Sequence, residues 1–349
     1  MARNRREFLQ MLGIGVAAAT CASPVAAWAQ RIRVLEGAEN PEQTPQASGV
    51  LNPEFQRFVA GIRVGEVKSH EGLRVFWLHG GPPGAPLPIA TLEEARSRGD
   101  FVITERDQAS VPELVVENRG KSHVLLMAGE ILLGGKQNRV LTEDILLPPM
   151  SGSRQVAVYC VEQGRWAGRG KDFDARGSFA APRLRAKVME RAGQSRVWSE
   201  VDRYTRMMGA PSATQSYQEI YEKKDVQRYF DGMVKHLNHG SPPGALGAAA
   251  FVGQAMAGLD LFFDPGLFSR EWPKLLRAHA LEAYRQPARG DADERGLRGR
   301  VEEVLRAAAK SEGSLRTNAG VGQLFEFRLE TLRGSALLFE HRVIHAAVL

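Results

Sequence analysis

The sequence predicts an α+β fold, with a β-rich N-terminal half, central helices and C-terminal strands that close a mixed sheet or sandwich. Apolar runs of strand length, separated by turn residues, fill residues 53–166, whereas residues 180–240 show the spacing of amphipathic helices. Runs of strand length return after residue 321. This order is typical of α+β proteins, because a doubly wound fold alternates strands and helices regularly.

The composition is that of a globular protein and excludes several other classes. Of the 349 residues, 43% are hydrophobic and 25% are charged, which is too apolar for a disordered chain. The net charge is only +6, so the sequence predicts no nucleic-acid partner. Of the two cysteines, Cys21 lies in an N-terminal leader and Cys160 is left alone, so we expect no internal disulfide.

The N-terminus has the features of a signal peptide. Three arginines within the first six residues precede an apolar run at 8–19, which is shorter than the ~20 residues that span a bilayer. Residues 27–29 read Ala-Trp-Ala, the pattern that signal peptidase accepts. We therefore expect residues 1–29 to be removed and the mature chain to have no stable transmembrane segment.

The start of this leader resembles a twin-arginine (Tat) signal. Residues 5–9 read Arg-Arg-Glu-Phe-Leu, which matches the centre of that motif, whereas Asn4 and Gln10 depart from it. The resemblance implies export by the Tat translocase, which leaves the protein periplasmic or secreted. Cys21 follows Ala-Ala-Thr, a departure from the usual lipid-attachment sequence, and its lipidation stays an open question.

One domain is expected after the leader. Residues 30–52 are rich in Pro, Gln, Glu and Ala without periodicity, and they are predicted to form a flexible segment. Residues 53–349 are predicted to form a single α+β domain, long enough to bury a sizeable core. It is β-rich over 53–166, helical over 180–240 and mixed over 245–349.

Turn and capping residues define the elements of the β-rich half. A hairpin is expected at 61–79, with its turn ending at Gly72. Thr91 and Glu94 have the spacing of a capping box, which predicts a short helix over 92–98. Strands are predicted at 61–67, 73–79, 101–105, 113–118, 124–133, 140–147 and 156–161.

The centre and the end of the chain combine helices with strands. Helices are predicted at 182–192, 197–208, 217–237, 268–284 and 300–310. The Gly-rich apolar segment 246–263 is predicted to be a buried strand pair with its turn at Gly253 or Gly258, because frequent glycines disfavour a helix. The closing strands are predicted at 321–332, 335–339 and 342–348, with a turn at Arg333-Gly334.

A dense polar cluster accompanies the apolar run at 124–133. Glu130 lies inside this run, where a carboxylate is costly unless it is paired or exposed in a cleft. Gly134 and Gly135 allow close approach of the backbone, and the polar residues after them suit an anionic or amide-bearing ligand. These polar residues are Lys136, Gln137, Asn138 and Arg139. In the alternative, Glu130 and Arg139 form a buried ion pair, and Gln137 and Asn138 bond to the turn.

A second polar cluster follows the strand predicted at 156–161. It combines Glu162 as an acid or base with Gln163, with Arg165 for a phosphate or carboxylate, and with Trp166 for stacking. In the alternative, Glu162 and Arg165 form a solvated pair and Trp166 packs in the core. Because loops at strand ends often line pockets, we expect both clusters to face one pocket.

The sequence identifies neither a metal site nor a cofactor. His236/His239 and His341/His345 are spaced like ligand pairs, but neither pair has the partners of a zinc signature. No phosphate-binding loop, nucleophile elbow, zinc-protease motif or dinucleotide fingerprint is present, so the cofactor is unknown. Cys160 is predicted to be a buried small hydrophobe, with a thiolate nucleophile as the alternative.

The two clusters resemble the signature blocks of a known family. The runs 129–139 and 160–166 are similar to blocks of the ADP-ribosylglycohydrolase- and rhodanese-phosphatase-associated protein domain family, formerly a domain of unknown function. The likeness covers about residues 52–349, and it includes Val197-Trp198, Asp260, Phe262-Phe263 and His345. The name records genomic association with enzymes of NAD and ADP-ribose metabolism. It implies a nucleotide-derived ligand by analogy, without an activity or catalytic residues.

Two functions are therefore expected. In the first, an exported protein binds and hydrolyses a small anionic, nucleotide- or ADP-ribose-like molecule, with Glu130 and Glu162 as general acid and base. The ligand-binding residues are then Lys136, Gln137, Asn138, Arg139, Gln163, Arg165 and Trp166. In the alternative, the chain is a non-catalytic periplasmic binding or scaffold domain whose polar clusters are structural. An envelope-binding basic surface over 165–191 is a further alternative.

Overall fold

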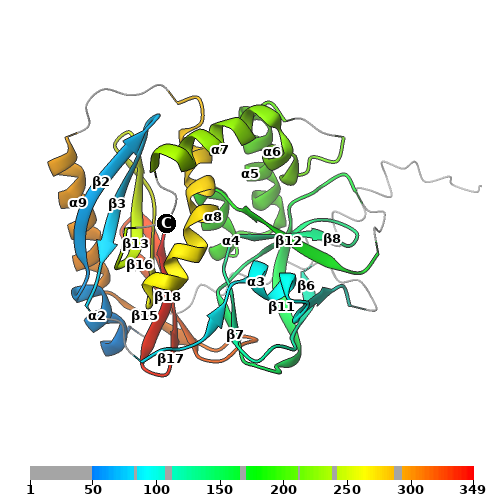
Figure 1. Ribbon diagram of the computed structural model, residues 1–349, viewed down its shortest axis with the longest axis horizontal. Coiled ribbons are helices and arrows are strands. Elements are labelled where there is room, and N and C mark those ends of the chain that lie inside the picture. Colours follow the sequence, from blue (N-terminus) through cyan, green and yellow to red (C-terminus); the bar gives the residue numbers. More distant parts are fainter. Residues whose placement is uncertain are drawn as a thin grey trace, which may run out of the picture. The chain divides into compact units, whose positions relative to one another are not determined.

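The computed structural model describes residues 49–81, 85–106, 112–165, 170–210, 213–237, 242–286 and 293–349. All of them belong to one compact unit, Pro41–Leu349. The α+β prediction is confirmed, since strands form three sheets in this part of the chain and helices occupy the centre of the sequence (Figure 1). The predicted signal peptide lies outside the described residues.

The largest sheet combines N-terminal and C-terminal strands. They are β1 (Val50–Leu51), β2 (Arg63–His70), β3 (Leu73–His79), β13 (Ala245–Val252), β14 (Ala255–Phe262), β15 (Glu312–Arg316), β16 (Gln323–Leu329), β17 (Leu332–Phe339) and β18 (Arg342–Val348). Their order is β1-β15-β16-β17-β18-β14-β13-β3-β2, and all neighbours are antiparallel. The C-terminal strands therefore complete a sheet that the N-terminal hairpin begins.

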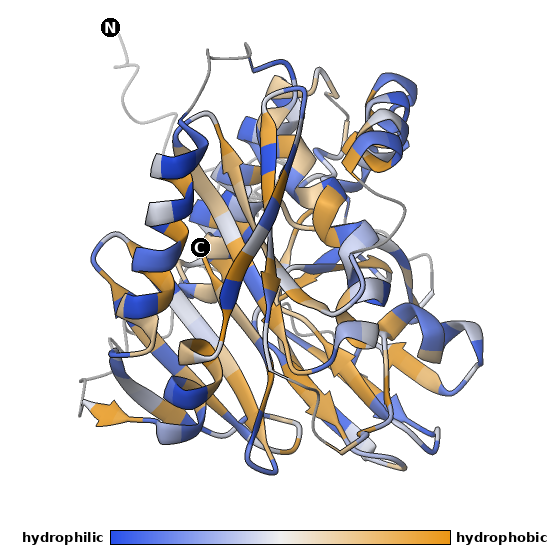
Figure 2. Ribbon diagram, turned by 60° about the vertical axis from the view of Figure 1, so that its left-hand side comes forward, coloured by the Kyte–Doolittle hydropathy of each residue, from blue (hydrophilic) through white to orange (hydrophobic). Residues whose placement is uncertain are grey.

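Each face of this nine-stranded sheet carries its own core, because side chains alternate along a strand. Phe76 and Leu78 of β3 pack in a cluster with α2 (Pro53–Ala60) and α9 (Glu294–Ala308). Val75 and Trp77 belong to the cluster on the other face, where α8 (Pro265–Ala283) lies (Figure 1). Hydrophobic residues concentrate in the sheets, and hydrophilic residues in the outward parts of the helices (Figure 2).

Two smaller sheets lie beyond α8. The first contains β5 (Phe101–Thr104), β6 (Glu113–Asn118), β8 (Glu130–Gly134), β9 (Arg139–Leu141), β11 (Gly152–Cys160) and β12 (Phe173–Phe179), in the order β12-β8-β9-β11-β6-β5. The second contains β4 (Ile89–Ala90), β7 (His123–Leu126) and β10 (Ile145–Leu147), in the order β10-β7-β4. Since α8 contacts both β13 and β12, it is packed between the nine-stranded and six-stranded sheets.

The remaining helices are short. They are α3 (Leu92–Ser97), α4 (Pro182–Met189), α5 (Gln194–Met207), α6 (Gln218–Glu222) and α7 (Lys224–Leu237). The predicted capping box of α3 is confirmed, because the Glu94 amide donates to Thr91 Oγ1 at 3.2 Å and the Thr91 amide donates to Glu94 Oε2 at 3.0 Å. Among the described helices, none has the length and apolar content needed to cross a membrane.

The predicted strands 124–133 and 140–147 are each wrong in the same way, because each is two strands in different sheets. The first divides into β7 and β8, and the second into β9 and β10. The first break lies at residues 127–129, where Gly129 has φ +101°, a value that glycine adopts readily. The two breaks touch, since the Ala128 amide donates to Asp144 Oδ1 at 2.8 Å. This contact positions Glu130 at the start of β8.

Three predicted helix boundaries differ from the structure for local reasons. The helix predicted from residue 300 begins at Glu294, because Asp293 caps it and accepts a bond from the Arg295 amide. The helix predicted at 217–237 is interrupted at Lys223, whose ψ of 122° is extended and separates α6 from α7. The helix predicted from residue 268 begins at Pro265, because Asp264 caps it and accepts a bond from the Leu267 amide at 2.6 Å.

Two turns were predicted at glycines in the second half of the chain, and the structure confirms one of them. The strand pair predicted at 246–263 is confirmed, with Gly253 in its turn at φ +59°. The turn predicted at Arg333-Gly334 is wrong, because both residues lie within β17. A Cβ at Gly334 would lie 2.1 Å from the Phe327 ring, so glycine here permits packing. The structure also contains β1, β4, β12 and β15, for which we predicted no strand.

Candidate functional site

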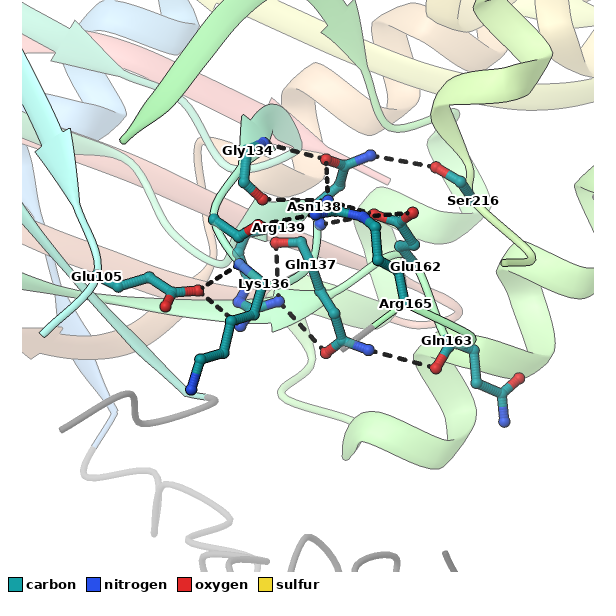
Figure 3. A network of polar contacts seen from close by, with 11 residues as sticks. Glu105, Gly134, Lys136, Gln137, Asn138, Arg139, Glu162, Gln163, Arg165 and Ser216 are labelled. Atoms are coloured by element: carbon teal, nitrogen blue, oxygen red, sulfur yellow. Dashed lines mark hydrogen bonds and ion pairs between the residues drawn. The ribbon is translucent and has the colours of Figure 1, made fainter. Parts of the chain in front are cut away.

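The two polar clusters singled out in the sequence meet in space (Figure 3). The turn between β8 and β9 lies against the chain that follows β11. We call this region the loop clasp, and its members are Glu105, Gly134, Gly135, Lys136, Gln137, Asn138, Arg139, Glu162, Gln163, Arg165 and Ser216. Trp166, the proposed stacking residue, lies outside the described residues.

Arg165 holds the loop clasp together. Its Nε and Nη2 donate to the two carboxylate oxygens of Glu162 at 2.9 and 2.7 Å. Its Nη1 donates to the Gly135 carbonyl at 2.7 Å. A bidentate pair between an arginine and a carboxylate is strong and geometrically specific. The two side chains are only 12% and 6% exposed, so the alternative of a solvated Glu162–Arg165 pair is wrong.

Asn138 and Arg139 also bond within the loop clasp. The Asn138 amide donates to Glu162 Oε2, and its side chain donates to Ser216 Oγ, both at 3.1 Å. Arg139 is 1% exposed, donates to the Gln137 carbonyl at 2.9 Å and lies 3.9 Å from Glu105 Oε1. The predicted alternative of an ion pair between Arg139 and Glu130 is therefore wrong, since Glu105 takes that place.

Both glycines of the loop clasp are required by close contacts. A Cβ at Gly134 would lie 2.2 Å from the Asp172 carbonyl oxygen, and one at Gly135 would lie 2.4 Å from the Phe173 ring. The tight turn that results lets the Lys136 amide donate to Glu105 at 2.8 Å, while the Lys136 side chain points away from the other residues (Figure 3). The polar groups of the clasp therefore bond mainly to one another, which suits a structural role.

Glu130 does not join the loop clasp. It lies at the opposite end of β8 from Gly134, about 13 Å away for a rise of ~3.3 Å per residue. The structure therefore does not bring Glu130 and Glu162 together. Glu130 belongs instead to a buried polar region around α8, which we call the inner polar layer. Its members are Glu93, Glu130, Asp144, Arg185, Asp260, Glu271, Lys274, His279 and His345.

Lys274 of α8 is the cation at one end of the inner polar layer. Its Nζ bonds to Glu130 and lies 2.6 Å from Glu271 and 3.0 Å from Glu93. The Lys274, Glu130 and Glu271 side chains are at most 4% exposed, whereas Glu93 is 33% exposed. In the part of the chain that the structure describes, these glutamates are the group placed closely enough to hold a metal ion, but the Lys274 ammonium lies among them.

Burial changes the protonation of this group. It raises the pKa of Glu130 to about 8, against the opposing effect of Lys274 and with support from Glu93 and Glu271. Burial also raises the pKa of Glu271. Burial by itself would lower the pKa of Lys274, but the three glutamates have the larger combined effect and hold this pKa well above its usual value. Glu130 thus keeps its proton near neutral pH, which is typical of acid–base sites.

His345 and Arg185 occupy the other end of the inner polar layer. His345, fully buried, lies between Asp144 and Asp260, at 2.6 and 3.1 Å. Arg185 donates to Asp260 at 2.6 Å and to the Ala128 carbonyl at 2.8 Å. Burial raises the pKa of Asp260, but Arg185 and the histidines outweigh it and hold that pKa well below its usual value.

Several buried atoms of the inner polar layer have no hydrogen-bond partner among the described residues. They are Arg185 Nη2, Asp260 Oδ2, both Glu271 oxygens and His279 Nδ1. Glu271 still has its ion pair with Lys274. Asp260 Oδ2 in turn lies 3.6 Å from His279 Nε2. Since buried polar groups in native proteins are nearly always bonded to protein or water, the atoms without such a neighbour are places for an ordered water.

The sequence reasoning missed most of the inner polar layer. Asp260 entered only through the family resemblance, and His345 through that resemblance and its spacing from His341. Glu93, Asp144, Arg185, Glu271, Lys274 and His279 were not selected, and the last three of these are the least expected from the sequence. The last three occupy a helix whose polar positions look like a solvated face, because helical periodicity does not reveal packing on both sides. A sequence signal did exist, because each of these three polar residues stands next to an apolar residue. These neighbours are Trp272, Leu275 and Ala280, and all three are buried.

Of the two histidine pairs, only His341 and His345 both lie in the described residues, and these two side chains have different surroundings. His345 is buried, whereas the His341 side chain is 90% exposed and bonds to Glu54. The His236 ring stacks on His70 at 3.8 Å between centroids, and His239 lies outside the described residues.

The remaining cysteine behaves as a small hydrophobe. Cys160 is 0% exposed at the end of β11, and burial raises the pKa of its thiol to about 11. The thiol therefore stays protonated near neutral pH, which argues against the alternative of a thiolate nucleophile.

A comparison with protein families places the chain in a known group. Residues 61–349 match the model described as "ARG and Rhodanese-Phosphatase-superfamily-associated Protein domain". The match includes the loop clasp and the whole inner polar layer. Neither the curated proteins nor the solved structures searched contain a match. Because the family model covers most of its length, the chain belongs to the ARG and Rhodanese-Phosphatase-superfamily-associated Protein domain family.

Proposed function

We propose that the protein is exported and binds a small molecule at the inner polar layer, where Glu130 is the acid–base group of a hydrolytic reaction. The observation that carries this proposal is a buried carboxyl with a pKa of about 8 beside the Lys274 ammonium. General acids work best when their pKa lies near the ambient pH. In this role Glu130 gives its proton to the leaving group as that group's bond breaks, water bonds to the atom that the group leaves, and the proton that this water loses returns to Glu130.

The charge of the inner polar layer determines which part of a ligand reaches Glu130. Glu93 and Glu271 lie beside a single lysine while Glu130 keeps its proton, so a phosphate here would meet two carboxyl groups and only one ammonium. A neutral, hydroxyl-bearing ring can donate hydrogen bonds to carboxylate oxygens such as those of Glu271 and accept one from Lys274. A nucleotide- or ADP-ribose-like compound contains such a ring, with its anionic groups outside the layer. The anion-binding role first given to Arg139 and Arg165 is less favoured, because both pair with glutamates.

Glu93 gives the inner polar layer its connection to solvent. Its side chain is 33% exposed, whereas Lys274, which it contacts, is 4% exposed. In this proposal a ligand approaches Glu130 from the side of Glu93, which has to turn away from Lys274.

Glu130→Gln is expected to reduce turnover at least ~100-fold, since a positioned general acid contributes that much. Its melting temperature should stay within a few degrees of the wild type, because the amide keeps the shape of the carboxyl. We would test ADP-ribose, nucleotides, sugar phosphates, neutral ribosides and peptides, measuring both thermal shift and product formation.

Glu162→Gln is the matched control, because Glu162 was the other candidate carboxylate. It is expected to lower the melting temperature by weakening the loop clasp. An unfolded or fully active Glu130→Gln variant contradicts the proposal.

The second candidate function is a non-catalytic binding or scaffold domain, favoured by the mutual bonding within the loop clasp. Stabilisation by one compound without chemical change would support it, as would no turnover across the whole set of compounds. Product formation that depends on Glu130 would exclude it.

Export through the Tat pathway is tested by replacing Arg5 and Arg6 with lysine. The Tat motif requires paired arginines, so the variant should remain in the cytoplasm with residues 1–29 uncleaved. Cell fractionation and the mass of the mature N-terminus measure this outcome. Normal export of the variant would indicate the general secretory pathway instead.

A further inference from the structure

His345 connects the nine-stranded sheet to the loop that carries Glu130. It lies on β18, with Nδ1 at 2.6 Å from Asp144 Oδ2 and Nε2 at 3.1 Å from Asp260 Oδ1. Ionised carboxylate oxygens only accept hydrogen bonds, so both ring nitrogens must carry hydrogen to bond both aspartates. The geometry therefore fits the charged imidazolium form.

Each aspartate is also linked by hydrogen bonds to the turn at residues 127–129, Asp144 directly and Asp260 through Arg185. Asp144 Oδ1 accepts from the Ala128 amide at 2.8 Å. Asp260 binds Arg185, whose Nε donates to the Ala128 carbonyl at 2.8 Å. Both backbone groups of Ala128 thus depend on the pair of aspartates that His345 joins, two residues before Glu130.

We propose that His345 is a pH-sensitive joint, and that loss of its proton releases the turn at 127–129 from the nine-stranded sheet. Without one N–H, a ring nitrogen lone pair faces a carboxylate at hydrogen-bond distance, which replaces attraction by repulsion. The hydrogen bonds of the joint do not depend on the proposed function. Only the idea that the joint regulates the site around Glu130 rests on that function.

Charged groups from four elements act on this joint. Asp144 and Asp260 face the ring directly, Arg185 of α4 and His279 of α8 contact Asp260, and Glu271 of α8 interacts with His345 through space. Burial lowers the pKa of His345, but the two aspartates have the larger combined effect and raise this pKa to about 9. The stabilisation that protonated His345 gives the folded state is therefore complete below pH 6.5, the pKa of histidine in the unfolded chain. It is lost as the pH rises through 9.

Amide hydrogen exchange on the full mature chain tests the joint. Rates corrected for intrinsic base catalysis should show protection of residues 127–130 falling about 100-fold between pH 6.5 and 9.5, since one pKa unit corresponds to a factor of ten. His345→Gln should show the alkaline level of protection already at pH 6.5, whereas His341→Gln, the exposed control, should match the wild type. Protection independent of pH would overturn the proposal.

Carbon NMR of the histidine rings gives a second readout that needs no variant to fold. One of the eight histidines should still be charged at pH 8 and lose its charge near pH 9. Titration of all eight below pH 7.5 would also overturn the proposal. Glu130→Gln should keep the pH dependence of exchange at 127–129 even though it is expected to lose turnover. The exchange experiment therefore tests the joint independently of the proposed catalytic role of Glu130.

Discussion

Lys274→Met is expected to lower the free energy of unfolding by about 3–5 kcal/mol at pH 7, the usual effect of removing one partner of a buried ion pair. Lys274 is the cation shared by Glu93, Glu130 and Glu271, and without it Glu271 and Glu93 lose their counter-charge at pH 7, where Glu130 keeps its proton. Methionine keeps the apolar stem of lysine, so the expected loss comes from the charge rather than from packing.

Urea unfolding at several pH values tests this expectation. The deficit should shrink at pH 5, because Glu271 has a raised pKa and takes up protons as the pH falls, whereas Glu130, with a pKa of about 8, is already protonated at pH 7. It should grow as the pH rises through 8. Lys235→Met, at an exposed position of α7, is the control and should change stability by less than ~0.5 kcal/mol. Equal effects of the two substitutions would mean that Lys274 is not the counter-charge.

Arg165→Met is expected to lower the free energy of unfolding by a similar amount, about 3–5 kcal/mol. The substitution leaves Glu162 buried without its bidentate partner, and it leaves the Gly134 and Gly135 carbonyls without their donor. The turn between β8 and β9 then loses its attachment to the end of β11.

Arg176→Met is the matched control for this second substitution. Arg176 is 66% exposed and lies 3.5 Å from Asp174, so its removal should change stability by less than ~1 kcal/mol. Chemical unfolding at pH 7 compares the two variants. If Arg165→Met instead kept full stability and lost binding of an anionic compound, Arg165 would be a ligand-binding residue as the sequence first suggested.

Local features of the structure were predictable wherever a few neighbouring residues decide them. Thr91 and Glu94 form the predicted capping box, because that pattern involves only one turn of helix. Gly253 lies in the predicted turn, because a positive φ favours glycine whatever surrounds it.

The division of the apolar run at 124–133 was not predictable in this way. Apart from Gly129 and Glu130 its residues are apolar, so periodicity does not show where the chain leaves one sheet and joins another. The break depends on Gly129, on the touching turn at Asp144 and on the Arg185 side chain far along the chain.

The sequence by itself determined the α+β class, the two polar segments that form the loop clasp, and the family resemblance that includes Asp260 and His345. Only the tertiary structure decided that Glu130 and Glu162 lie apart and that Lys274, rather than Arg139, is the partner of Glu130. The physical reason is that a buried charge is stabilised by whichever opposite charge packing brings within a few ångströms, and Lys274 lies 144 residues from Glu130 along the chain.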